Sequence, residues 1–167
     1  MAGAGLRWWA GKIRQAWSHV RAHVRPDERA ALVSWTTPAQ RALFDAMHVA
    51  DRRHGLDVVT RLRRAGVEDT DALLAGLLHD AGKGDAGLAV RVAFSLGQAY
   101  GHWIWRLARF VPGFRTTLGR LIEHADGSAR LAAAAGCSLR TVELIRWQET
   151  PRDVEFGETL RLADEAS

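Results

Sequence analysis

Apolar residues recur at spacings of three and four along most of this 167-residue chain, and this spacing constrains the fold more than any other feature. Such a spacing places apolar side chains on one face of an α-helix, whereas a half-buried strand needs apolar and polar residues to alternate. Alternating runs of β-branched residues are few. The sequence therefore predicts an all-α fold, a single compact helical bundle of about seven to eight helices.

The composition limits the cellular setting and the classes of partner. Cys137 is the single cysteine, so no disulfide can form within the chain and a structural metal site built on thiolates is excluded. No apolar run approaches the roughly 20 residues that span a bilayer. Lys12 and Arg14 interrupt the N-terminal apolar stretch, so we expect no signal peptide and a cytoplasmic protein. The net charge of +4 permits anionic partners, namely nucleic acid, nucleotides, phosphate esters or anionic lipid.

Residues 5–25 predict a basic amphipathic helix without any acidic residue. Its apolar stripe and its arginines lie on neighbouring faces, and three tryptophans, Trp8, Trp9 and Trp17, lie in its first four turns. Such a helix can lie on anionic lipid, giving peripheral membrane contact, but the commoner arrangement packs the stripe on the helix's own domain. We therefore divide the chain into an N-terminal helix at 1–25 and a helical domain at 26–167.

Local signals predict where the helices of the domain begin and end. Pro26 begins a helix at 26–34. In "TTPAQ", Thr37 is the expected N-cap, Pro38 the first helical residue, and Gln40 the residue that closes a capping box. Asp51 is the expected cap of the next helix, and Ser138 is the expected cap of the helix that ends near residue 148. Further helices are expected at about 51–65, 69–82, 86–110, 114–124, 127–135, 138–148 and from 158 onward.

The stretch "LLAGLLHDAGKG", residues 73–84, carries the strongest chemical signal. Adjacent helical residues point about 100° apart, so His79 and Asp80 can reach one ion only if it lies between their directions. An aspartate near a helix C-terminus is unfavourable against the macrodipole and needs a compensating cation. A metal ion or Lys83 would supply it. A strip of small residues on the same helix, which leaves room for another helix or a ligand, contains Ala72, Ala75 and Gly76.

The same stretch resembles the signature of the HD superfamily of metal-dependent phosphohydrolases. The segment "ADRRHGLDVVTRL" is similar to the upstream ligand helix of that family and gives His54 as the first ligand. The segment "LRLADEAS" is similar to the final helix and gives Asp164 as the last. The resemblance covers roughly residues 38–167, and "TPAQRALFDAM" is similar to small bacterial members. It implies an HD-type helical domain that binds one divalent ion through His54, His79, Asp80 and Asp164.

Two imidazoles and two carboxylates suit manganese, iron, cobalt, nickel or zinc, and magnesium is a further candidate. The resemblance implies hydrolysis of a phosphate ester, either a monoester or a diester, by a water that the ion activates. The substrate would be a small phosphorylated compound or a nucleotide. Asp80 would take part in catalysis and Lys83 would stabilise negative charge. Asp57, one turn after His54, could orient that imidazole, but surface charge is the simpler interpretation.

Departures from the family pattern leave the subtype open. His124, in "LIEHADGSARLA", stands where two-metal members have a further histidine and is a candidate extra ligand or substrate contact. About twenty residues later, where those members have more histidines, this chain has Trp147 and Gln148, so we predict one metal ion. A "GYP" motif is absent, which argues against the cyclic-dinucleotide phosphodiesterases.

Two alternatives belong to other functional classes. A protein of the same fold could bind metal or ligand without catalysis. Residues 127–148 also resemble a helix-turn-helix, with Gly136 at the turn and Arg140 and Arg146 on the second helix. Most residues of that second helix are apolar, so few side chains remain to contact bases. We therefore do not expect nucleic acid as the partner. The oligomeric state is left open.

Overall fold

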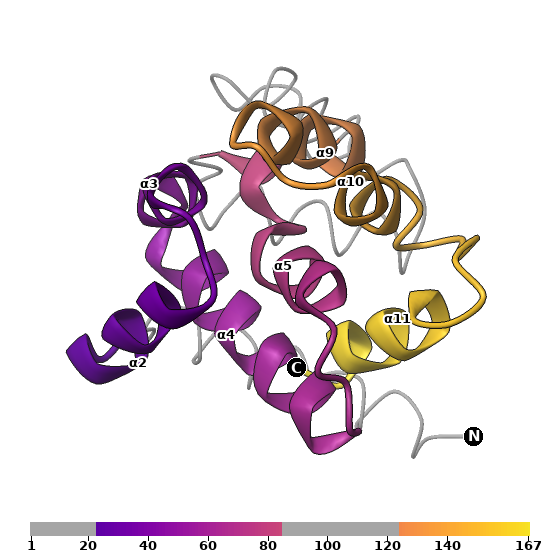
Figure 1. Ribbon diagram of the computed structural model, residues 1–167, viewed down its shortest axis with the longest axis horizontal. Helices are drawn as coiled ribbons and strands as arrows, with labels where there is room; N and C mark the ends of the chain where they lie inside the picture. Colours follow the sequence, from indigo (N-terminus) through magenta and orange to yellow (C-terminus); the bar gives the residue numbers. More distant parts are fainter. Residues whose placement is uncertain (1–22, 85–123) are drawn as a thin grey trace, which may run out of the picture.

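The computed structural model describes residues 23–84 and 124–167, and every secondary-structure element in these two ranges is helical (Figure 1). The prediction of an all-α fold is therefore confirmed for this part of the chain. The predicted helix at 86–110 lies outside the described residues, as do those at 5–25 and 114–124 apart from residues 23–25 and residue 124. Residues 23–25 are not helical and lead directly into the first described helix.

The first two helices follow their local signals. Helix α2 (Pro26–Ala31) continues into the 3-10 helix η1 (Leu32–Ser34), as predicted for residues 26–34. Helix α3 (Pro38–Ala46) begins with the predicted capping box. The Thr37 hydroxyl accepts a hydrogen bond from the Gln40 amide at 3.3 Å, and the Gln40 side chain accepts one from the Thr37 amide at 2.9 Å.

Helix α4 (Val49–Arg64) begins earlier than predicted, so Asp51 is not its cap. His48 holds that position, with Nδ1 accepting a hydrogen bond from the Ala50 amide at 3.3 Å. The reason is that Met47 and His48 are both extended, with ψ of 153° and 144°, which places Asp51 inside the first helical turn. The next helix begins where predicted, at residues 69–70, and Asp69 is its cap, since Asp69 Oδ1 accepts a hydrogen bond from the Ala72 amide at 2.9 Å.

Helix α5 (Thr70–Leu78) ends four residues before the predicted end at Gly82. His79 is its C-cap, Asp80 lies between helices with φ −99° and ψ 4°, and Ala81–Lys83 form the 3-10 helix η2. The Gly82 amide donates a hydrogen bond to Ser128 Oγ at 2.8 Å, which is a contact with a distant part of the chain. His79 and Asp80 therefore lie in a turn, and their relative direction is not that of two residues on one helix.

Three helices complete the described part, α9 (His124–Ala134), α10 (Leu139–Arg146) and α11 (Gly157–Glu165). Gly136 has φ +76° between α9 and α10, and Ser138 caps α10 by accepting a hydrogen bond from the Thr141 amide, as predicted. His124 belongs to the same helix as 127–134, so the predicted break between 124 and 127 is wrong.

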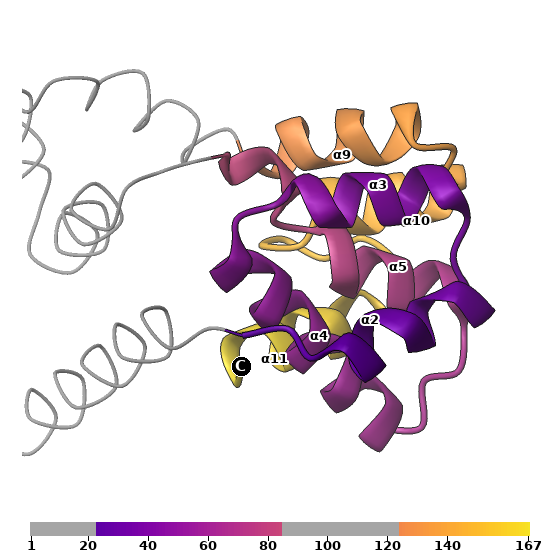
Figure 2. The same ribbon diagram turned by 90° about the vertical axis from the view of Figure 1, so that its left-hand side faces the viewer.

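Helix α5 runs through the middle of the bundle, and each of its residues from Ala72 to Leu78 is buried. Figure 2 shows α3 and α9 on one side of it and α4 and α11 on the other, with α10 alongside. The small-residue strip is used for helix packing, because a Cβ atom added to Gly76 would lie 2.8 Å from Leu62 Cδ1 of α4 and 3.6 Å from Leu160 Cδ1 of α11. This packing brings the end of α5 close to both helices. Within the described ranges, no helix has both the length and the apolar character needed to cross a bilayer.

Candidate metal centre

Three side chains meet at the end of α5, one from α4, one from α11 and one from His79, the C-cap of α5. Nε2 of His54, on α4, lies 2.7 Å from Oδ1 of Asp164, on α11. Nε2 of His79 lies 3.3 Å from the same oxygen, and the two imidazole rings are 5.2 Å apart between centroids. The potential ligand atoms of the three residues all lie within 4.8 Å of one another. The structure therefore brings together three of the four ligands expected from the sequence.

Asp80, the fourth expected ligand, lies beside this triad with its two oxygens in different surroundings. Oδ1 is 3.5 Å from His79 Nε2, and Oδ2 is 2.6 Å from Lys83 Nζ. The side chain is 2% exposed, so the carboxylate is removed from water. Lys83 thus supplies a cation to Asp80, which was one of the two possibilities for that charge.

His79 has its tautomer set by the backbone. Nδ1 lies 3.0 Å from the Gly76 carbonyl oxygen, and because a carbonyl only accepts, Nδ1 carries the proton. Nε2 of a neutral ring then presents a lone pair toward the carboxylates of Asp164 and Asp80. Both Nε2 and Asp80 Oδ1 are buried and have no hydrogen-bond partner within 23–84 and 124–167. Acceptors that face one another in this way need a shared proton or a cation between them.

The electrostatics of the site favour positive charge at its centre. Burial by itself lowers the pKa of His79, but the carboxylates of Asp80 and Asp164 outweigh it and raise that pKa above its ordinary value. Burial raises the pKa of Asp80, yet His79 and Lys83 outweigh it and hold the pKa well below the usual range. The pKa of Asp164 is lowered likewise, against burial, by its hydrogen bond with His54 and by the nearby imidazole of His79. Both carboxyl groups are therefore anionic.

His124 and Gln148 form a neighbouring pair. His124 Nε2 lies 3.9 Å from Asp80 Oδ1 and 3.0 Å from Gln148 Nε2. The structure thus places His124 at the site, where the sequence suggested an extra ligand or a substrate contact. Gln148 was missed as a site residue. The available signal was its spacing, because it follows Leu144 and Ile145 by four and three residues and so continues the buried face of α10.

A close contact between η2 and α9 holds this pair against Asp80. A Cβ atom added to Gly82 would lie 2.5 Å from the Ser128 amide nitrogen and 2.6 Å from the His124 carbonyl oxygen. The hydrogen bond from the Gly82 amide to Ser128 Oγ fixes the same contact. The turn that carries Asp80 and Lys83 is therefore pressed onto the first described turn of α9.

Other candidates from the sequence have structural partners. Asp57 pairs with Arg53 at 2.9 Å and its side chain is 48% exposed, which agrees with the surface interpretation. Arg53 also binds Glu28 at 2.8 Å. On the second helix of the suggested helix-turn-helix, Arg140 binds Asp153 at 2.9 Å, and Arg146 binds Glu143 at 2.6 Å. These guanidinium groups are engaged by carboxylates of the same chain.

Comparisons of the chain with protein-family models, with curated proteins and with solved structures found no match. The candidate centre is therefore defined by its own geometry: His54, His79 and Asp164 around a common point, with Asp80, Lys83 and His124 beside it.

Proposed function

We propose that the protein binds one divalent metal ion through His54, His79, Asp80 and Asp164 and hydrolyses a phosphate ester, in the manner of the HD superfamily. The observation that carries the proposal is the buried Nε2 of His79, which faces two carboxylates without a hydrogen-bond partner among the described residues. A cation between these groups satisfies the lone pairs on both sides at once.

The donor set fits a metal ion of intermediate character. Imidazole nitrogens and carboxylate oxygens together suit manganese, iron, cobalt, nickel or zinc. The bond between His79 Nδ1 and the Gly76 carbonyl oxygen is the kind that orients a metal-ligating imidazole. When bound, the ion would lower the pKa of a coordinated water and stabilise charge on phosphoryl oxygens.

Lys83 and Asp80 act together at the edge of this set. The ammonium group anchors Asp80 Oδ2 and so leaves Oδ1 directed toward His79. An ammonium group has three N–H donors, and Asp80 accepts one. The others can bind the phosphoryl oxygens of a substrate, whose negative charge Lys83 would help to neutralise.

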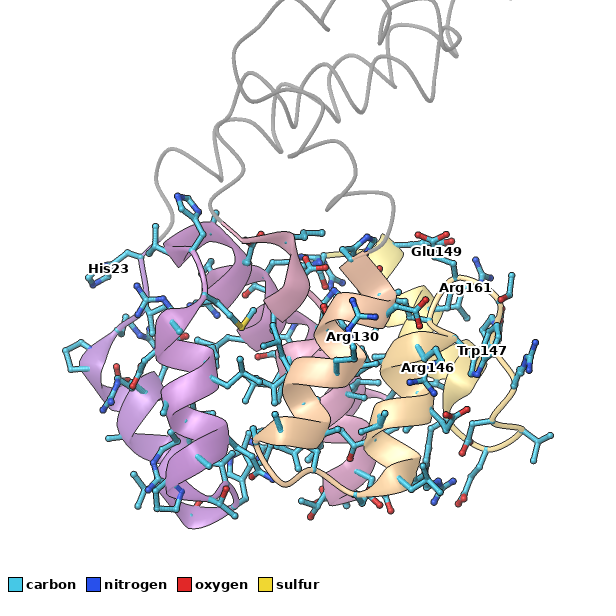
Figure 3. The ribbon with its side chains drawn as sticks, turned by 90° about the horizontal axis from the view of Figure 1, so that it is seen from above. His23, Arg130, Arg146, Trp147, Glu149 and Arg161 are labelled. Atoms are coloured by element: carbon cyan, nitrogen blue, oxygen red, sulfur yellow. The ribbon has the colours of Figure 1, made fainter. Side chains whose placement is uncertain are left out.

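Metal analysis of the purified protein tests the proposal. We expect the wild-type chain to hold about one ion, and His54→Gln, His79→Ala and Asp80→Ala to hold less than about a tenth of that amount. His23→Gln is the matched control, because His23 is exposed and lies at the opposite end of the described part from Glu149, the neighbour of Gln148 (Figure 3). Unchanged metal content in both His79→Ala and Asp80→Ala would rule out the site.

The bond between Lys83 and Asp80 favours a second candidate function, metal or ligand binding without catalysis. A lysine held by a buried carboxylate neutralises that charge and can serve the fold alone. A screen for phosphate release from nucleotides and phosphorylated metabolites separates the two functions. Release that is lost in Asp80→Ala supports hydrolysis, and a metal-loaded protein that releases phosphate from no compound supports binding alone.

A further inference from the structure

Gln148 has one end of its side-chain amide bonded and the other end without a partner. The residue lies just after α10, is 7% exposed, and places Nε2 3.0 Å from His124 Nε2. Its Oε1 is fully buried and accepts no hydrogen bond within the described parts of the chain. A buried amide oxygen without a donor is costly, so native proteins supply one from a water, an ion or a ligand.

The position of this oxygen relates it to the metal centre. His124 Nε2 connects the two, since it lies 3.0 Å from the Gln148 amide and 3.9 Å from Asp80 Oδ1. Three buried side-chain atoms without hydrogen-bond partners thus gather here, His79 Nε2, Asp80 Oδ1 and Gln148 Oε1. A bound cation would interact with the first two atoms, which lie 3.5 Å apart. The third belongs to a neutral amide that is bonded to His124 and needs a donor of its own.

The donor cannot come from the phosphate of the substrate, because the oxygens of an ionised phosphate ester only accept hydrogen bonds. A donor supplied by the substrate must therefore come from its alcohol part. An ammonium group there would add a further positive charge near Lys83 and the bound ion, whereas a hydroxyl group adds none.

We propose that Gln148 Oε1 accepts a hydrogen bond from a hydroxyl group of the substrate, which makes this a site for phosphate esters of polyhydroxy alcohols, such as sugar or polyol phosphates. This inference rests on the proposed function, because the phosphate would bind at His54, His79, Asp80 and Asp164. His124 orients the amide, because its Nε2 lies 3.0 Å from the amide nitrogen of Gln148.

Two phosphonates that cannot be hydrolysed test the inference by calorimetry on the metal-loaded protein. Butylphosphonate and 3,4-dihydroxybutylphosphonate have the same carbon chain and differ only in their hydroxyl groups. We expect the wild-type protein to bind the dihydroxy compound about tenfold more tightly. Gln148→Leu, which removes both polar atoms at similar volume, should bring the ratio of the two affinities to about one. Gln148→Met is the second variant if the leucine disturbs folding.

Gln40→Leu is the matched control, because Gln40 is also a buried glutamine but belongs to the capping box of α3. This variant should keep the wild-type ratio of affinities. Equal affinities in the wild-type protein, as a bound water on Oε1 would give, or an unchanged ratio in the Gln148 variants would overturn the inference alone. Loss of the ion in those variants would also overturn it, by making Gln148 a metal ligand. A wild-type protein that holds no ion would overturn the proposed function and the inference with it.

Discussion

The imidazole of His79 is oriented by its own helix, because the Gly76 carbonyl oxygen holds Nδ1 and leaves Nε2 directed at Asp164 and Asp80. The ring is 2% exposed, so water cannot satisfy that nitrogen. A single residue thus combines a fixed tautomer, burial and two carboxylate neighbours. This combination is what the proposed metal site requires of a ligand, whereas a histidine that only fills the core does not need it.

Asp164→Asn tests the contribution of one carboxylate to metal binding. The amide has nearly the same size but no charge, and its NH₂ group can donate to His54 Nε2 in place of an ion. We expect the affinity for a divalent ion to fall by at least about 100-fold, measured by competition with a chromogenic chelator. Asp126→Asn is the control, since Asp126 is 61% exposed and binds Arg146. Wild-type affinity in Asp164→Asn would remove Asp164 from the ligand set.

Two helical glycines differ in how much space surrounds them. A Cβ atom on Gly55 of α4 would lie 2.5 Å from the Leu77 carbonyl oxygen of α5, a backbone atom that cannot move alone. On Gly127 of α9, the nearest such contact is 3.6 Å, which is ordinary packing. The first glycine is required for the approach of two helices, and the second is not.

Gly55→Ala should therefore lower the free energy of unfolding by about 1–3 kcal/mol, because α4 and α5 must separate to admit a methyl group. His54 precedes Gly55, so the displacement should weaken metal binding as well. Gly127→Ala should leave stability unchanged or raise it by up to about 1 kcal/mol, since alanine favours a helix. Urea denaturation of both variants checks the contrast, and equal effects would contradict it.

The segment between α10 and α11 is held by one carboxylate. Asp153 binds Arg140 at 2.9 Å and accepts hydrogen bonds from the amides of Phe156 and Glu155 at 2.9 and 3.0 Å. These contacts, the arginine first, lower the pKa of Asp153 from 3.8 to about 2. The segment leads into α11, which carries Asp164, so this clamp sets where that helix begins.

Asp153→Asn should cost about 1 kcal/mol of unfolding free energy at pH 7. Because folding lowers the pKa of Asp153, its contribution is complete above the unfolded pKa and is lost as the pH falls from about 4 to about 2. The difference between wild type and variant in urea denaturation should therefore shrink over that range. Asp27→Asn, whose side chain is 72% exposed, should show no such loss. A difference between wild type and Asp153→Asn that persists at pH 2 would contradict this assignment.

For the whole molecule, the candidate centre ties together helices that are distant in sequence. His54, His79 and Asp164 come from α4, α5 and α11, which lie together in Figure 1. An ion that binds only the folded chain stabilises it by about 2.7 kcal/mol at 100 times its dissociation constant. For a domain of this size, we expect a rise in Tm of about 5–10 °C on adding the preferred metal.

Thermal unfolding with and without a chelator measures this effect, and Asp164→Asn is the variant in which it should disappear. His23→Gln should retain the full shift. A shift of the same size in Asp164→Asn would place the bound ion elsewhere on the chain.

Features that depend on neighbours within a few residues can be predicted from the amino-acid sequence. The all-helical class follows from apolar spacing, and Thr37 and Ser138 cap helices as predicted, because a cap bonds an amide two or three positions away. The HD-type resemblance also predicted His54, His79 and Asp164 as ligands of one ion, and the structure brings these three side chains together. That prediction came from the motifs that resemble the HD superfamily, since no local interaction places residues 54 and 164 side by side.

The end of α5 and the surroundings of its last residues depend instead on contacts between distant parts of the chain. The helix stops at Leu78 while the Gly82 amide binds Ser128 Oγ, and the Gln148 amide meets His124 across 24 residues. These contacts join parts of the chain that local propensity cannot relate. A buried polar group takes whichever partner the packing of distant helices delivers, so its partner is fixed by the fold as a whole.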